Sequence, residues 1–284
     1  MKKVILASLV LLTLPCLLLS ETYVMLDTNT VKEGGIIKIK IKSNEPLKAT
    51  SIKFLDKTYQ AFYKKFDIRD TEYVCAAIIP VPMGTSGTKK MKISYLLKDD
   101  TEGTTIEKIR VKTVKSRESV INTGQINEAF NEEMAKESAI IKKLQDPVTP
   151  VKYDFPFIIP VEGINTGGYG DQRVYDNGKA AWRHKGLDIA AKKGEPIRAA
   201  SSGNVVSASS TQSCGNIVIL DHGAGIYSMY YHMQKVYVKK NSRVSKGDIV
   251  GTVGATGIAT GPHLHWQINV YKVPVNPAEF LTEF

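Results

Sequence analysis

The chain has 284 residues, of which 43% are hydrophobic, so it can bury a core in one large domain or two ordinary ones. This composition excludes an intrinsically disordered chain. Lys and Arg total 38 against 28 Asp and Glu, and the formal charge of +10 favours acidic partners such as an anionic polymer, a lipid surface or a nucleic acid. Because the charges are scattered along the chain, a basic solvated surface is favoured over a nucleic-acid patch, and we expect no nucleic-acid partner.

Residues 1–20 have the pattern of a secretory signal peptide. Lys2 and Lys3 precede an apolar run from Val4 to Leu19, which is shorter than the roughly 20 residues that cross a bilayer comfortably. Cleavage after Ser20 would place the chain in the cell envelope, either periplasmic or secreted. Retention of the segment would instead associate the chain with a membrane.

Residues 21–115 are predicted to form a β-sandwich of the immunoglobulin-like kind. Ile37, Ile39 and Ile41 alternate with lysines, and the same period of two recurs twice before residue 113. Turn signals separate these runs, as expected for several short strands. The stretch contains no histidine, and its lysine-lined faces are interpreted as the solvated sides of sheets.

Residues 116–154 are predicted to form a helical linker. Acidic residues lie early and lysines late, as the helix macrodipole favours, and Asp146-Pro147 ends the pattern. The apolar positions at helical spacing are Ile126, Phe130, Met134, Ile141 and Leu144. We therefore expect one helix that docks on a neighbouring element, within a chain that is otherwise all-β.

The sequence contains three cysteines, Cys16, Cys75 and Cys214. Cys16 lies inside the predicted signal segment. The other two lie in different predicted domains and in no paired pattern, so two unrelated thiols are favoured over a disulfide.

Residues 155–284 are rich in glycine and in strand-forming residues, and all five histidines of the chain follow residue 180. His184 and Asp188 are four residues apart, which places both side chains on one face of an extended strand. His263 and His265 alternate with Leu264, so their two imidazoles point the same way. We therefore expect the histidine chemistry to lie in this half of the chain.

Neutral imidazoles and a carboxylate are good zinc ligands, and three protein ligands with one open position form the catalytic arrangement. The metal lowers the pKa of a water in the open position towards about 7. Each motif alone is a weak or moderate signal, but together they indicate a metal site. His232 ends an aromatic run and is a further candidate. His222 is interpreted as a turn residue at a hairpin and not as a ligand.

These segments resemble the M23 peptidases, the LytM and lysostaphin-like group of peptidoglycan hydrolases. The likeness covers residues 155–284. The matching segments are Gly167-Gly168-Tyr169-Gly170, His184 through Ala191, Gly203 through Val206, Gly215 through Ile219, Tyr231-His232-Met233, Lys246-Gly247-Asp248, Gly254 through Gly257 and Thr260 through Trp266. Trp266 stands where the family often has Phe. The resemblance implies a β-rich peptidase domain of the LytM type after the β-sandwich and the linker.

The resemblance also implies roles for the site residues. It assigns one zinc per chain to His184, Asp188 and His265. It assigns the handling of the water and of the developing oxyanion to His232 and His263, without dividing the two tasks between them. Nothing in the pattern sets an oligomeric state.

The implied function is that of a secreted zinc metalloendopeptidase that hydrolyses peptide cross-links of bacterial peptidoglycan, which would be its partner. The alternative is a catalytically silent LytM-type regulator that activates another cell-wall hydrolase, and the intact set of five residues argues against it. A third hypothesis, a structural or adhesin-like surface protein that requires zinc, leaves the presence of both motifs unexplained. Candidate groove-lining residues are Tyr169, Arg173 and Tyr230, although Tyr230 fits a strand core equally well.

Overall fold

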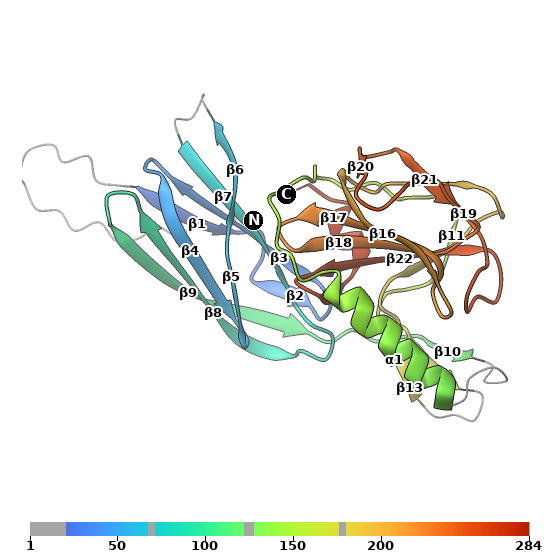
Figure 1. Ribbon diagram of the computed structural model, residues 1–284. Coiled ribbons are helices and arrows are strands. Elements are labelled where there is room, and N and C mark those ends of the chain that lie inside the picture. The colour runs from blue at the N-terminus through green and yellow to red at the C-terminus, as the bar shows by residue number, and fades with distance from the viewer. Residues whose placement is uncertain (1–20, 68–71, 122–127, 176–179, 284) are drawn as a thin grey trace, which may run out of the picture. The chain divides into compact units, whose positions relative to one another are not determined.

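The computed structural model describes residues 21–67, 72–121, 128–175 and 180–283, so the predicted signal segment lies outside the described residues. The chain divides into two compact units, one that ends at Thr113 and one that comprises Val114–Phe284, and each is described by itself. Both consist mainly of strands, and the described residues contain one α-helix, which confirms the predicted all-β class with a single linker helix (Figure 1). Within the described ranges, no helix has the length and apolar character needed to cross a membrane.

The first unit contains two sheets. One has the order β1-β3-β7-β6, and the other has the order β2-β9-β8-β4-β5. The strands of the first sheet are β1 (Thr22–Leu26), β3 (Ile36–Ser43), β7 (Glu72–Pro80) and β6 (Phe62–Asp67). Those of the second are β2 (Thr30–Lys32), β9 (Glu102–Lys112), β8 (Gly87–Leu97), β4 (Leu47–Phe54) and β5 (Lys57–Tyr59).

The core of this unit comes from alternate residues of both sheets. Ile37, Ile39 and Ile41 of β3 are fully buried, as are Ile52 of β4 and Ile93 of β8. Because successive strand residues point to opposite faces, one face of each sheet is apolar and covers the other. The arrangement is compatible with the predicted immunoglobulin-like sandwich.

The prediction that the lysine faces are solvated is wrong for Lys38, of which only 6% is exposed. Lys38 lies in β3, which is flanked by β1 and β7, and the Asp27 amide donates to the Lys38 carbonyl at 3.0 Å. The Lys38 amide donates to the Asp27 carboxylate at 2.9 Å. Burial raises the pKa of Asp27, while this hydrogen bond and the Lys38 charge act in the opposite direction.

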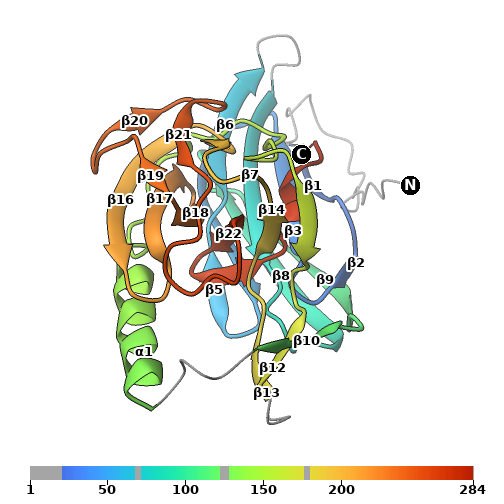
Figure 2. The same cartoon turned by 90° about the vertical axis from the view of Figure 1, so that its right-hand side faces the viewer.

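The second unit is built around an eight-stranded sheet of order β11-β14-β22-β18-β17-β16-β20, with β23 paired to β22. Figure 2 shows β14, β22 and β18 side by side in this sheet. The strands are β11 (Ile164–Gly167), β14 (Leu187–Ala190), β22 (His263–Val270), β18 (Ile226–Met233), β17 (Gly215–Gly223), β16 (Gly203–Thr211), β20 (Arg243–Val244) and β23 (Val273–Val275).

Two small sheets and two helices complete this unit. One sheet joins β10 (Glu118–Ile121), β12 (Gln172–Tyr175) and β13 (Ala180–Arg183), and β10 runs parallel to β12. The other joins β15 (Pro196–Arg198), β21 (Ile249–Thr252) and β19 (Lys235–Val236). The helices are α1 (Glu128–Lys143) and the short 3-10 helix η1 (Pro277–Phe280).

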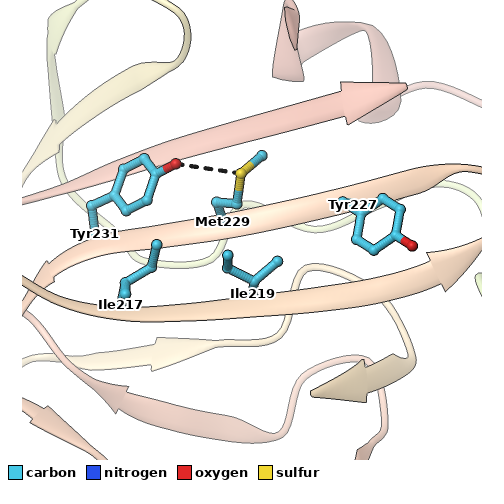
Figure 3. Packing of buried hydrophobic residues seen from close by; sticks show 5 residues of the cluster. All are labelled: Ile217, Ile219, Tyr227, Met229 and Tyr231. Carbon is cyan, nitrogen blue, oxygen red and sulfur yellow. Dashed lines mark hydrogen bonds between the residues drawn. The ribbon is translucent and has the colours of Figure 1, made fainter. Parts of the chain in front are cut away.

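Helix α1 lies within the predicted linker and docks on its own unit. Ile141 and Leu144, at and just beyond its C-terminal end, pack against a buried cluster. Figure 3 shows that cluster, which consists of Ile217, Ile219, Tyr227, Met229 and Tyr231 from β17 and β18. The expected docked helix is therefore present, although the predicted stripe positions Ile126 and Phe130 lie outside the side chains that the structure describes.

Candidate active site

Three neighbouring strands bring the predicted site residues together. In the β14–β22 pair, Asp188 lies directly opposite His265, and in the β22–β18 pair His265 lies opposite Tyr231. His232 is the next residue in β18, and His263 lies two residues before His265 in β22. As predicted from the alternation, His263 and His265 approach from the same side of β22, because both rings lie near Asp188 Oδ1.

The structure corrects the predicted placement of His184. We expected His184 and Asp188 on one continuous strand, but β13 ends at Arg183 and β14 begins at Leu187. His184 lies in the bend between them and still places its Nε2 3.0 Å from Asp188 Oδ1. The bend requires Gly186, because a Cβ there would lie 2.4 Å from the Trp266 carbonyl oxygen and 2.9 Å from the His265 ring.

Three side-chain atoms converge at the centre of the site. His184 Nε2 lies 3.0 Å from Asp188 Oδ1 and 2.9 Å from His265 Nδ1, and His265 Nδ1 lies 2.9 Å from Asp188 Oδ1. These separations are close to the roughly 3.3 Å between neighbouring ligands of a tetrahedral zinc. The geometry therefore has the size of a metal centre.

The hydrogen-bond partners of these groups suit the binding of a cation. His184 Nδ1 is 2.8 Å from the Gly168 carbonyl oxygen, which can only accept, so Nδ1 carries the hydrogen and Nε2 a lone pair. His265 Nε2 donates to Gln267 Oε1 at 3.5 Å, so Nδ1 carries the lone pair. With Asp188 Oδ1, three atoms converge that can each offer a lone pair when both rings are neutral. A divalent metal ion satisfies such a set, and imidazole and carboxylate ligands fit zinc.

His232 and His263 lie beside these three donors. Their ring centroids are 4.8 Å apart, and the His232 centroid is 6.3 Å from that of His265. His232 Nδ1 donates to the Thr256 carbonyl at 2.8 Å, and His263 Nδ1 donates to the Gly261 carbonyl at 2.9 Å. Each ring therefore keeps its Nε2 lone pair available to accept a proton.

Burial shapes the electrostatics of the site. Burial raises the pKa of Asp188, but contact with the His184 and His265 rings outweighs burial and holds this pKa well below its usual range. Burial lowers the pKa of His232 to about 4, and the neighbouring histidines act in the same direction. Burial also lowers the pKa of His265, although contact with Asp188 partly offsets this. His232, His265 and the carboxylate are thus in their metal-binding or proton-accepting forms at neutral pH.

His232 has an unusual backbone conformation. Its φ of 61° lies in the left-handed region, which non-glycine residues rarely adopt. The conformation is held by its amide, which donates to the Cys214 carbonyl at 2.9 Å. Backbone strain of this kind persists where the surroundings over-determine it, and it concentrates at functional sites.

Arg173, which the sequence suggested as a groove-lining residue, instead contacts a metal-ligand candidate. Its Nη2 lies 2.6 Å from Asp188 Oδ2, and its Nη1 donates to Ser119 Oγ at 2.7 Å. This leaves Asp188 Oδ1 as the oxygen that could ligate a metal ion. Sequence reasoning also missed Gln267, although a polar residue two positions after His265 on a buried strand face is a detectable signal.

The other two groove candidates have structural contacts. The Tyr169 hydroxyl donates to the Pro274 carbonyl at 2.7 Å. Tyr230 is fully buried, and its hydroxyl accepts from the Ala200 amide at 2.8 Å. Tyr230 is therefore a core residue, as the alternative interpretation had it.

His222, predicted to be a turn residue at a hairpin, lies just before the turn that joins β17 and β18. It is fully buried at the end of β17. Its Nδ1 donates to the Ser202 carbonyl and its Nε2 pairs with the Ser228 hydroxyl, each at 2.7 Å. Cys75 and Cys214 are both free thiols, as expected.

Comparison with known proteins points to one family. The sequence profile of peptidase family M23 matches residues 182–277, a range that contains all five predicted site residues. The peptidoglycan DD-endopeptidase ShyA of Vibrio cholerae is 35% identical over 111 residues, which cover 39% of this chain and 26% of ShyA. The DD-carboxypeptidase/endopeptidase Mpg of Neisseria meningitidis is 37% identical over 97 residues, which cover 34% of this chain and 22% of Mpg.

The matched region spans about a quarter of the length of these two relatives. A crystal structure of a Pseudomonas aeruginosa protein assigned to peptidase M23 has a TM-score of 0.65 and 23% sequence identity, covering 89% of this chain and 95% of that one. This likeness shows a shared fold. Within the C-terminal unit, residues 182–277 match peptidase family M23.

Proposed function

We propose that the chain is a secreted zinc metalloendopeptidase that hydrolyses peptide cross-links of bacterial peptidoglycan. The observation that carries the proposal is the convergence of His184, Asp188 and His265 through three atoms about 3 Å apart, with His232 and His263 beside them. Two relatives named as peptidoglycan or D,D-specific peptidases support this substrate and a D,D-type cross-link.

The metal would be held by His184 Nε2, Asp188 Oδ1 and His265 Nδ1, with one zinc per chain. When bound there, zinc would supply a Lewis acid that polarises the scissile carbonyl and lowers the pKa of water. His232 and His263 each present an Nε2 lone pair at the edge of this set. One of them accepts the proton of the attacking water, and the other, when protonated, donates a hydrogen bond to the developing oxyanion.

A catalytically silent regulator is the less favoured function. Such a protein needs the fold but not the five polar side chains, whereas here each of the four histidines has one ring nitrogen within hydrogen-bond distance of a carbonyl or amide oxygen. This arrangement suits metal binding and proton transfer and supports the enzyme over the regulator. The predicted signal segment and a wall polymer as substrate both favour a location in the cell envelope, periplasmic or secreted.

Digestion of purified peptidoglycan by the full chain tests the proposal. We expect soluble muropeptides, loss of activity with a chelator, and recovery when zinc is restored. Mass spectrometry of the products identifies the bond that is cut. Intact peptidoglycan after incubation with the zinc-loaded chain, together with activation of a second wall hydrolase, would favour the regulator instead.

A further inference from the structure

The outer face of the five-stranded sheet in the first unit is strongly basic. Strand alternation exposes its cations on the side opposite the core, since the intervening Val31, Met91 and Ile109 are buried. Seven exposed cations lie on four adjacent strands, namely Lys32, Lys53, Lys90, Lys92, Lys108, Arg110 and Lys112. We call these seven residues the basic face.

The pairing register places like charges directly opposite one another. Three cross-strand pairs consist of two lysines each: Lys32 with Lys112, Lys53 with Lys92, and Lys90 with Lys108. Such pairs destabilise a sheet. No cation of the basic face forms an ion pair with any residue that the structure describes. Folding does not explain this arrangement, which points to an external anionic partner.

We propose that the basic face binds the free peptide carboxylates of peptidoglycan and so holds the enzyme on its polymer. The backbone positions of neighbouring cations are roughly 5 Å apart across strands and roughly 7 Å apart along them, and such a repeat suits a polymer with repeated anionic groups better than a single small anion. The choice of polymer rests on the proposed function. Binding through a second unit of the same chain raises the local concentration of cleavable bonds.

The test measures binding of the metal-free full chain to insoluble peptidoglycan, so that no cleavage takes part. Lys90→Thr/Lys108→Thr removes one opposed pair and keeps residues that favour strands. We expect binding to weaken roughly tenfold, and wild-type binding to fall as salt rises. The matched control is Lys239→Thr/Lys240→Thr, which removes the same charge from exposed positions of the second unit and should change binding less than about twofold.

Three results would overturn this proposal. They are equal losses in the two double variants, unchanged binding to peptidoglycan whose carboxylates have been amidated, and tighter binding to anionic lipid vesicles than to the wall. Hydrolysis is assayed separately with the zinc-loaded chain. If the chain cleaves peptidoglycan but does not bind it through the basic face, the proposed function stands and the inference about the basic face fails. If the chain binds peptidoglycan through the basic face but does not cleave it, the inference stands and the proposed function fails.

A second, independent observation concerns a buried row of side-chain amides behind the metal site. His265 Nε2 donates to Gln267 Oε1 at 3.5 Å, and Gln267 Nε2 donates to Asn269 Oδ1 at 2.8 Å. Asn269 Nδ2 then donates to Gln145 Oε1, also at 2.8 Å. Gln267, Asn269 and Gln145 are 8%, 4% and 2% exposed, so water does not compete for these bonds.

Gln145, just beyond the end of α1, determines in which direction the hydrogen bonds of this row are donated. Gln145 Nε2 donates to the Ile141 carbonyl at 3.1 Å, and a carbonyl can only accept. Each amide in the row must then donate towards Gln145 in turn. His265 is consequently held with its hydrogen on Nε2 and its lone pair on Nδ1, the atom that faces His184 and Asp188.

We infer that Gln145 is a positioning residue for the metal ligand His265, so that α1 and its C-terminal end belong to the catalytic unit although they precede residues 182–277. Glu137 forms a second connection from α1. Its buried carboxylate accepts from the Gln212 amide at 2.6 Å, in the turn that leads to Cys214, whose carbonyl accepts from the His232 amide.

A double-mutant cycle on zinc affinity tests the role of Gln145 in the full chain. Gln267→Leu should weaken zinc binding roughly tenfold, because groups that orient a metal ligand contribute about that much. Gln145→Leu should weaken zinc binding by roughly three- to tenfold. The double variant should bind zinc as weakly as Gln267→Leu alone, because that substitution already interrupts the row of hydrogen bonds. Ile141→Ala is the matched control, since it loses packing on the same helix but keeps the carbonyl that Gln145 uses.

The measurement is competition between the chain and a zinc chelator, with thermal unfolding of the metal-free chain as a check on folding. A merely structural role for Gln145 predicts that Ile141→Ala lowers zinc affinity as much as Gln145→Leu does. It also predicts that the two Leu substitutions act independently. Either outcome, or unchanged affinity in Gln145→Leu, contradicts the inference.

Discussion

Arg173 and Asp188 form a close ion pair, with Nη2 of the arginine 2.6 Å from Oδ2 of the carboxylate. The two side chains are 17% and 16% exposed, so the pair is largely shielded from water. The contact requires Gly167, where a Cβ would lie 2.4 Å from Asp188 Oδ2 and 2.7 Å from Arg173 Nη2. The arginine fixes which oxygen of Asp188 is left for the metal.

Arg173→Met should therefore weaken zinc binding by roughly 10- to 100-fold, because Asp188 loses the partner that orients it. Arg173→Lys should recover only part of the lost zinc affinity, because a lysine lacks the planar guanidinium that contacts both Asp188 and Ser119. Chelator competition measures both variants. Arg198→Met, at an exposed arginine of the same unit, serves as the control and should leave the zinc affinity unchanged.

His222 should make the stability of the fold depend on pH. Burial lowers its pKa from 6.5 to about 4, so the unfolded chain binds a proton more readily than the folded chain between these values. The free energy of unfolding should therefore fall as the pH drops from about 6.5 to about 4, by about 3 kcal/mol from this residue, and stay level above that range.

Chemical denaturation at several pH values, on the wild type and on His222→Gln, measures this effect. The variant should show a smaller decrease towards low pH. Part of the decrease should remain, because burial also lowers the pKa of His232. Equal pH dependence in the two proteins would exclude His222 as the cause.

Truncation should show where the catalytic unit begins. A fragment that starts at Val114 keeps β10 and α1, and we expect it to fold and bind zinc like the full chain. A fragment that starts at Val151 loses Ser119, Glu137 and Gln145 and uncovers the cluster under Ile141 and Leu144. It should bind zinc at least tenfold more weakly. Equal zinc affinity in the two fragments would show that the linker is dispensable.

Features set by neighbouring residues could be predicted from the sequence, whereas contacts between residues far apart in the chain could not. The pair His263 and His265 was predictable because a strand alternates its faces, and the buried isoleucines of β3 were predictable for the same reason. His184 was placed on the wrong element, since the sequence does not reveal that the chain bends at Gly186. The partners of Asp188 and Asn269 were not predictable, because Arg173 and Gln145 lie 15 and 124 residues away and only the folded sheet brings them close.

The measurement that tests the central claim most directly is zinc content beside peptidoglycan digestion for His265→Ala and His263→Ala. Loss of a ligand should lower both metal content and activity, because two remaining ligands hold zinc poorly. His265→Ala should therefore be poor in zinc and inactive. His263→Ala should retain about one zinc per chain while its activity falls by roughly 10²–10⁴-fold. Full zinc content in His265→Ala, or loss of zinc in His263→Ala, would contradict the account.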